Sequence, residues 1–128
     1  MDAGCRRGRT MAKIMIADDS RTSRKILLDI VRGLEFDEII EATDGNDAVA
    51  KFDEYQPEVV TLDITMPGKD GIEVLKEIKE KNPNAKVVMI TAAAQSNKIM
   101  EAIKLGAEEF IAKPYETAQV EAALKRLI

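Results

Sequence analysis

The sequence predicts an α/β fold, a three-layer αβα sandwich in which helices cover both faces of a five-stranded parallel sheet. Two patterns lead to this prediction. Five short apolar runs of strand length alternate with five amphipathic segments at helical spacing. The run Val59-Val60-Thr61-Leu62 lacks polar alternation, which is typical of a strand buried on both faces. Parallel neighbours need a crossover segment, and amphipathic helices are the usual crossovers.

The first half of the chain predicts two strands and two helices. A strand over 13–17 ends in Asp18-Asp19, and Ser20 can cap the helix that follows. A short strand over 39–42 then precedes a helix over 46–54. Both helices have apolar residues at helical spacing: Ile26, Leu27, Ile30, Val31 and Leu34 in the first, and Ala48, Val49 and Phe52 in the second.

The second half repeats the alternation three times. The expected strands are 59–63, 86–90 and 109–112, and the expected helices are about 71–81, 96–105 and 116–127. Turn residues separate them: Pro67 and Gly68 follow the first of these strands, Asn82-Pro83 closes its helix, and Gly106 ends the next helix. The inward positions are Ile72, Leu75 and Ile78, and then Val120, Ala123, Leu124 and Leu127.

Composition restricts the classes of function. The 128 residues carry a net charge of -4 with both signs mixed along the chain, so we expect no nucleic-acid binding by this chain alone. No apolar run reaches the roughly 18 residues of a membrane span, so we expect no membrane contact. The single cysteine, Cys5, indicates a reducing cytoplasm, and the absence of histidine removes the commonest general base.

Length and patterning predict one domain over residues 11–128. Residues 1–10 carry three arginines and no periodicity, and we expect a disordered leader. It is interpreted as an expression-vector remnant or as a start site placed ahead of the natural start at Met11, and a basic docking tail is the functional alternative.

Polar residues follow four of the predicted strands. Asp18 and Asp19 follow the first strand, Asp63 ends the third, Thr91 follows the fourth and Lys113 the fifth. Because ligands of open parallel sheets bind at the carboxyl ends of the strands, these side chains predict a site there. Three carboxylates without histidine or cysteine favour a hard divalent ion, Mg²⁺ before Ca²⁺. A loop-capping Asp63 and a helix-dipole role for the Asp18-Asp19 pair are the non-functional alternatives.

The same edge predicts a place for a phosphoryl group. A lysine, a hydroxyl and a metal around one carboxylate can hold phosphoryl oxygens, although Lys113 could also be only a neutralising ion pair. No Walker loop or Rossmann glycine pattern indicates a nucleotide. We therefore expect Asp63 to act as a nucleophile that forms an acyl phosphate, with Thr91 supplying the hydroxyl.

Taken together, Asp18-Asp19, Asp63 with Met66-Pro67 and Asp70-Gly71, Thr91-Ala92 and Lys113-Pro114 resemble the receiver domain of two-component response regulators. The resemblance runs from about Lys13 to the end of the chain. It implies a flavodoxin-like sheet with strand order 2-1-3-4-5, the order known for the chemotaxis regulator of this family. It also implies a signalling protein that catalyses only its own phosphorylation and dephosphorylation, rather than an enzyme.

The resemblance implies a role for each site residue. Asp63 is the phosphoacceptor, and a histidine kinase is the phosphodonor. Mg²⁺ is bound directly by Asp19, Asp63 and the backbone carbonyl of Thr65, and through water by Asp18. Lys113 pairs with the carboxylate and then with phosphoryl oxygens.

Other residues are implied in the switch. Thr91 moves toward the phosphoryl group, and Ala92 offers its backbone N–H. Phe110 is the aromatic that fills the vacated space, and a plain core role is the alternative. The Lys113–Pro114 peptide is implied to be cis. Residues of helix 96–105, strand 109–112 and helix 116–127 form the implied partner face.

The segment from Ala92–Gln95 through Ile99–Ile103, and the Lys-Pro-Tyr ending after the fifth strand, look similar to stand-alone chemotaxis (CheY-like) regulators. Such a protein acts as a monomer, with a flagellar motor switch protein as target and a phosphatase as a further partner. A phosphorelay intermediate and the receiver of a transcriptional regulator are alternatives. From other classes, a Mg²⁺-dependent aspartyl-phosphate phosphatase is disfavoured by Thr65, where a second acid is usual, and a flavodoxin-like electron carrier is disfavoured by Asp18-Asp19.

Overall fold

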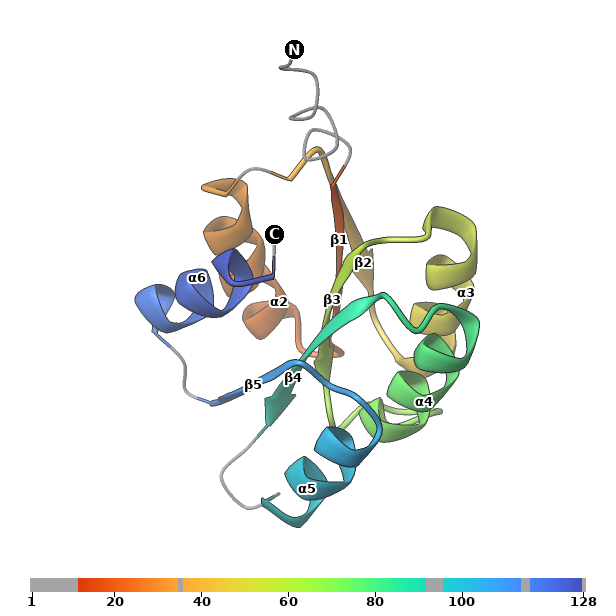
Figure 1. Cartoon of the computed structure of the whole chain (residues 1–128). Helices are drawn as coiled ribbons and strands as arrows, with labels where there is room; N and C mark the ends of the chain where they lie inside the picture. The colour runs from red at the N-terminus through yellow and green to blue at the C-terminus, as the bar shows by residue number, and fades with distance from the viewer. Residues whose placement is uncertain (1–11, 35, 92–95, 114–115, 128) are drawn as a thin grey trace.

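The computed structural model describes residues 12–34, 36–91, 96–113 and 116–127. Within them, five parallel strands lie in the order β2-β1-β3-β4-β5, with helices on both faces (Figure 1). The strands are β1 (Lys13–Ala17), β2 (Glu38–Ala42), β3 (Val59–Asp63), β4 (Lys86–Thr91) and β5 (Glu109–Ala112). The helices are α2 (Arg21–Arg32), α3 (Gly45–Tyr55), α4 (Gly71–Lys81), α5 (Ser96–Lys104) and α6 (Thr117–Lys125). The predicted fold class and strand order are confirmed.

The helix starts follow from side-chain caps. The Ser20 hydroxyl accepts the Ser23 N–H at 3.3 Å, as predicted, and α2 begins at the next residue, Arg21. Asp44 caps α3 in the same way, which moves its start one residue ahead of the predicted Asn46. At α4, Asp70 and Glu73 form a reciprocal capping box, so the predicted start at Gly71 is confirmed.

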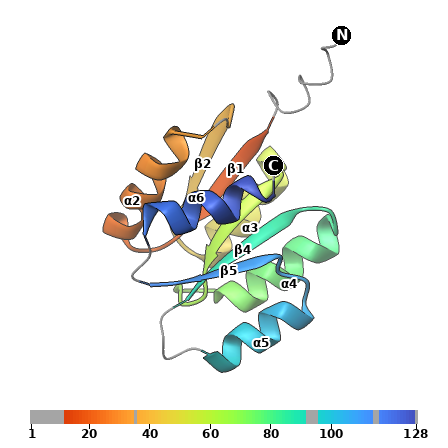
Figure 2. The ribbon, with the colours of Figure 1, turned by 60° about the vertical axis from the view of Figure 1, so that its left-hand side comes forward.

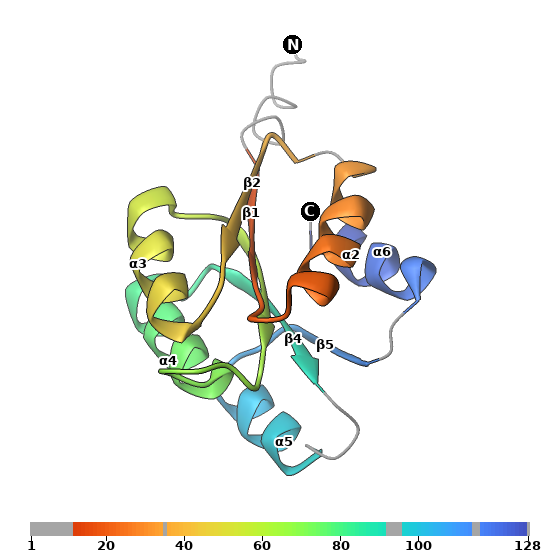
Figure 3. The same ribbon diagram turned by 180° about the vertical axis from the view of Figure 1, so that it is seen from behind.

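The helices form two layers around the sheet. Figures 1 and 3 show α2 and α6 on one face and α3, α4 and α5 on the other, and Figure 2 shows α6 in front of the sheet beside α2. Each layer buries its own apolar cluster, the first around Leu27, Ile90 and Leu124 and the second around Phe52, Leu62 and Leu75. No helix within the described ranges has both the length and the apolar character that a membrane span requires.

One apolar position of α2 departs from the predicted stripe. Leu27, Ile30 and Val31 are buried, whereas Ile26 is 46% exposed. Ile26 directly precedes Leu27, and one residue corresponds to a rotation of about 100° around the helix. Ile26 therefore lies beside the stripe that faces the sheet, and Leu28 packs partly against the core from the other flank.

The parallel register brings the strand ends together at one edge. Ala17 of β1 pairs with Leu62 of β3, so Asp18 and Asp63 follow at the same level. Thr91 of β4 pairs with Ala112 of β5, and the Lys113 N–H donates to the Thr91 carbonyl at 2.8 Å. The residues predicted to form a site therefore share the carboxyl edge of the sheet.

Candidate functional site

Three carboxylates meet at this edge, and we refer to Asp18, Asp19 and Asp63 as the acidic cluster. One carboxylate oxygen of each lies within 4.8 Å of the others. Asp18 and Asp63 are buried, with 1% and 5% of their surface exposed, whereas Asp19 is exposed. Two unit charges about 4 Å apart repel by roughly 4 kcal/mol at an effective dielectric near 20, so the cluster attracts positive charge.

Asp18 is held by its own backbone and by the start of α2. Its N–H donates to the Ala42 carbonyl at 3.1 Å, which continues the pairing of β1 with β2. Its Oδ1 accepts the Ser20 N–H at 2.8 Å. Ser20 therefore binds Asp18 through its backbone and caps α2 through its side chain. The other oxygen, Oδ2, is buried and has no hydrogen-bond partner among the described residues.

Asp63 is held by its neighbours in the chain. Its Oδ1 accepts the Thr65 N–H at 3.2 Å. The Gly71 N–H donates to the Ile64 carbonyl at 2.7 Å, which draws the start of α4 against the end of β3. A Cβ on Gly71 would lie 2.3 Å from the Asp63 carbonyl oxygen, so this approach needs a glycine.

Lys113 supplies the positive charge. Its Nζ donates to Asp63 Oδ2 at 2.9 Å and lies 3.7 Å from Asp18 Oδ2, the latter an ion pair beyond hydrogen-bond distance. Burial by itself would lower the pKa of Lys113, but the hydrogen bond and charge of Asp63 outweigh it, with help from the other two carboxylates. The pKa of Lys113 is therefore raised. The lysine stays protonated at neutral pH.

For Asp18, unlike Lys113, burial outweighs the favourable contacts. Burial raises the pKa of its carboxyl above the ordinary value, and the repulsion of Asp63 acts in the same direction. The Ser20 N–H and the Lys113 charge lower this pKa and only partly offset the increase. The folded protein therefore disfavours the charged form of Asp18 relative to an aspartate in water.

The residues fit a hard divalent cation. The cluster offers only oxygen ligands, which is the preference of Mg²⁺. Asp18 Oδ2 has no hydrogen-bond partner among the described residues, so it is a buried acceptor that a cation or its bound water could satisfy. The charge of Lys113 neutralises one of the three negative charges in the acidic cluster. The arrangement suits an ion together with a phosphoryl group, whose oxygens need the same positive charges.

The family model of the response regulator receiver domain matches residues 14–125. The chain belongs to this family. Among curated receiver proteins, the chain is 44% identical to the chemotaxis protein CheY of Listeria monocytogenes over 116 residues, which cover 91% of this chain and 98% of that protein. It is 41% identical to CheY of Thermotoga maritima over 115 residues, with 90% and 96% covered.

A solved receiver structure has a similar fold. It is the CheX-CheY-BeF3-Mg+2 complex from Borrelia burgdorferi, whose matched chain is 37% identical, with a TM-score of 0.84. The match covers 90% of this chain and 87% of that chain. These comparisons confirm the predicted family.

Of the remaining residues to which the resemblance assigns a role, the structure describes two and does not describe two others. Thr91 is buried at the end of β4, next to β5, and Phe110 of β5 is 49% exposed. A plain core role for Phe110 is therefore wrong, because a core aromatic would be covered. Ala92 and Pro114, for which the resemblance implies a backbone donor and a cis peptide, lie outside the described residues.

The loop from β3 to α4, which carries Thr65, is held by the start of α3. The Gly45 N–H donates to the Pro67 carbonyl at 3.3 Å, and a Cβ on Gly45 would lie 2.0 Å from the Lys69 carbonyl oxygen. Lys69 also pairs with Glu77 of α4. The sequence analysis did not predict these contacts.

Sequence reasoning also missed Arg24 of α2. Its guanidinium donates to the Asp18 carbonyl at 2.7 Å, and its side chain is only 14% exposed. Arg24 precedes Leu27 and Val31 by three and seven residues, so a charged residue occupies the apolar stripe of the receiver's first helix. A charged residue at a position of the apolar stripe was the sequence signal that could have identified Arg24.

Proposed function

We propose that this receiver is a stand-alone response regulator that accepts a phosphoryl group on Asp63 from a phosphohistidine of a histidine kinase. The observation that supports this proposal is the 2.9 Å contact between Lys113 Nζ and the Asp63 carboxylate, inside a cluster of three carboxylates. The chain has no histidine, which agrees with a partner that supplies the phosphohistidine. The receiver catalyses only its own phosphorylation and dephosphorylation.

The reaction is a displacement at phosphorus. A carboxylate oxygen of Asp63 attacks, the new O–P bond makes an acyl phosphate, and the N–P bond of the phosphohistidine breaks, with the imidazole as leaving group. The Lys113 ammonium lies beside Asp63 Oδ2 and would neutralise phosphoryl oxygens as they approach. Asp19, Asp63 and the Thr65 carbonyl would hold Mg²⁺ directly and Asp18 through water; the bound ion supplies charge that stabilises the transferring group.

Phosphorylation would be transmitted to a partner face. The added group carries about -1.5 to -2 charge and draws the Thr91 hydroxyl inward, which leaves space for Phe110. The face formed by α5, β5 and α6 exposes apolar side chains: Met100 is 60% exposed, Ile103 48% and Phe110 49%. Exposed apolar side chains close together are typical of a protein-binding surface.

We infer a role in chemotaxis, with a flagellar motor switch protein as the target. The proteins named CheY that align over nearly their full length support this inference. A kinase and a phosphatase would set the level of phosphorylation of a monomeric, cytoplasmic receiver that does not itself bind nucleic acid. The Mg²⁺-containing complex of a similar chain supports the choice of ion.

The test is intact mass after incubation with acetyl phosphate, with and without Mg²⁺. We expect a Mg²⁺-dependent gain of about 80 Da, one phosphoryl group, in the wild-type chain and none in Asp63→Ala. Asp29→Ala is the matched control, since Asp29 is an exposed aspartate of α2 that pairs only with Arg32 among the described residues. A folded wild-type chain that gains no mass, or an Asp63→Ala variant that still gains it, would contradict the assignment.

A further inference from the structure

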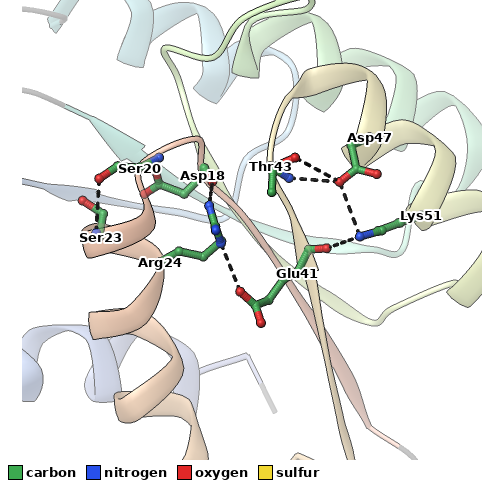
Figure 4. A network of polar contacts seen from close by, with 8 residues as sticks. All are labelled: Asp18, Ser20, Ser23, Arg24, Glu41, Thr43, Asp47 and Lys51. Atoms are coloured by element: carbon green, nitrogen blue, oxygen red, sulfur yellow. Dashed lines mark hydrogen bonds and ion pairs between the residues drawn. The ribbon is translucent and has the colours of Figure 1, made fainter.

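Arg24 joins the acidic cluster to the edge strand of the sheet. It lies in the first turn of α2, and Figure 4 shows its guanidinium between the end of β1 and Glu41 of β2. Nη1 donates to the Asp18 carbonyl at 2.7 Å, and Nε donates to Glu41 Oε1 at 3.0 Å. The planar guanidinium can make both bonds at once, which a lysine cannot do in the same geometry.

Glu41, the outer partner of Arg24, is itself held. Its carbonyl accepts from Lys51 Nζ of α3 at 2.6 Å, and Lys51 lies 3.4 Å from Asp47 Oδ2. The same Asp47 oxygen accepts the Thr43 N–H at 3.0 Å, directly after β2 (Figure 4). Arg24 therefore connects Asp18 to a side chain whose backbone is tied to α3.

The Asp18 carbonyl belongs to the peptide unit that links Asp18 to Asp19. Its oxygen and the Asp19 N–H lie in one plane, so a bond to this carbonyl sets the orientation of that plane. With the Ala42 and Ser20 contacts, Asp18 is held at its N–H, its side chain and its carbonyl. Only the last of these contacts lies at the junction with the exposed Asp19.

We propose that Arg24 is a positioning residue for the metal site: by binding the Asp18 carbonyl it fixes the Asp18–Asp19 peptide plane and so directs both carboxylates toward Asp63. The buried Asp18 Oδ2, which has the Lys113 ion pair at 3.7 Å but no hydrogen-bond partner among the described residues, is the independent sign that this arrangement serves a ligand. The inference rests on the proposed function, because it assumes that the acidic cluster binds Mg²⁺.

Positioning and simple charge predict opposite effects. Arg24 carries a positive charge near the cluster, so its removal would strengthen Mg²⁺ binding if charge alone mattered. If Arg24 orients the carboxylates, its removal weakens binding instead. Loss of a residue that orients metal ligands typically reduces metal affinity about tenfold or more.

The experiment measures the Mg²⁺ dissociation constant by calorimetric titration of the full chain at constant ionic strength. We expect Arg24→Met to weaken Mg²⁺ binding about tenfold. Arg32→Met is the control, because it removes the same charge from an exposed position at the other end of α2. Arg24→Lys, which keeps the charge and one bond, should recover part of the affinity. An Arg24→Met affinity equal to or tighter than that of Arg32→Met overturns the proposal.

A second pair of variants keeps the proposal testable if Arg24→Met does not fold. Glu41→Ala removes the outer anchor, and Glu38→Ala removes an equivalent charge from the same strand; both side chains are 45% exposed. We expect weaker Mg²⁺ binding in Glu41→Ala than in Glu38→Ala, and equal affinities overturn the inference.

The carbonyl ¹³C shift of Asp18 provides a readout that is independent of metal. It should move when Arg24 is replaced and stay in place when Arg32 is replaced, and an unmoved shift overturns the contact. A wild-type chain that binds no Mg²⁺ would instead contradict the proposed function. If wild type binds Mg²⁺ and Arg24→Met merely loses thermal stability with unchanged affinity, only the positioning role fails.

Discussion

Lys113 Nζ lies 2.9 Å from Asp63 Oδ2, although the two residues are 50 positions apart and their strands are not neighbours. In the sheet order, β4 separates β3, which ends at Asp63, from β5, which ends directly before Lys113. The lysine therefore reaches across the end of the intervening strand. The contact links the proposed phosphoacceptor to the strand that carries Phe110.

Replacing Lys113 should separate phosphorylation from its consequence. We expect Lys113→Ala to gain a phosphoryl group from acetyl phosphate, while the amide shift change of Phe110 on phosphorylation becomes smaller, because no ammonium draws phosphoryl oxygens toward β5. Backbone NMR spectra before and after phosphorylation measure this. Lys76→Ala, at an exposed position of α4, removes the same charge and should behave as wild type. A full Phe110 response in Lys113→Ala would refute the role of the lysine.

Neutralising Asp18 should stabilise the metal-free protein. Asp18→Asn removes a buried charge, one of whose oxygens has no hydrogen-bond partner among the described residues. We expect the free energy of unfolding at pH 7 to rise by about 1–3 kcal/mol, the usual cost of an unsatisfied buried group. Denaturant unfolding in excess chelator measures the difference. A loss of stability in this variant would show that the charged form is favourable even without metal.

The pH dependence of the Asp18 effect has a defined sign. The folded-state pKa of Asp18 lies above its ordinary value of 3.8, so the folded state binds this proton more tightly than the unfolded state. The contribution of Asp18 to stability is thus fully present below pH 3.8 and is lost as pH rises through the raised value. The advantage of Asp18→Asn should therefore be largest at neutral pH and disappear at acid pH; an advantage that grows toward acid pH would contradict the raised pKa.

A methyl group at Gly71 should disturb the site directly. A Cβ there would lie 2.3 Å from the Asp63 carbonyl oxygen. We therefore expect the free energy of unfolding of Gly71→Ala to fall by at least about 1–3 kcal/mol, and phosphorylation of this variant to be slower. Gly33→Ala is the control, because Gly33 has a φ of -82° and a Cβ there would lie 3.4 Å from its nearest neighbour, the Ile30 carbonyl oxygen. Thermal unfolding and intact mass measure both effects, and similar behaviour of the two variants would contradict the close approach.

Thr61 offers a test of the core next to the site. It is 1% exposed, its hydroxyl has no hydrogen-bond partner among the described residues, and it pairs with Ile16 and Val88 on the neighbouring strands. Thr61→Val keeps the shape and removes the polar group, so we expect unchanged or higher stability, by up to about 1 kcal/mol. Thr61→Ser, which keeps the hydroxyl and loses the methyl, should be destabilised. If Thr61→Val is clearly less stable than wild type, the hydroxyl has a partner such as a buried water.

Element types were predictable because they depend on local patterns. The apolar run of β3 and the helical spacing in α4 identify these elements, and the bounds of α4 and β5 agree with the prediction. Ends were less predictable where a side chain decides them, as Asp44 does for α3. Ile26 was assigned to the apolar face of α2, yet it is 46% exposed, because the direction of the stripe is set by the sheet against which the helix packs.

By itself, the sequence determined the α/β class and the edge that carries the site, since carboxyl ends of parallel strands converge wherever helices make the crossovers. Tertiary structure decided the individual contacts, and only the family resemblance, not any local pattern, implied the pairing of Lys113 with Asp63. Lys113 bonds Asp63 because β5 lies two places from β3, and Arg24 bonds the Asp18 carbonyl because α2 packs back over β1 toward β2. Such pairs depend on strand order and helix placement over tens of residues, which no local pattern encodes.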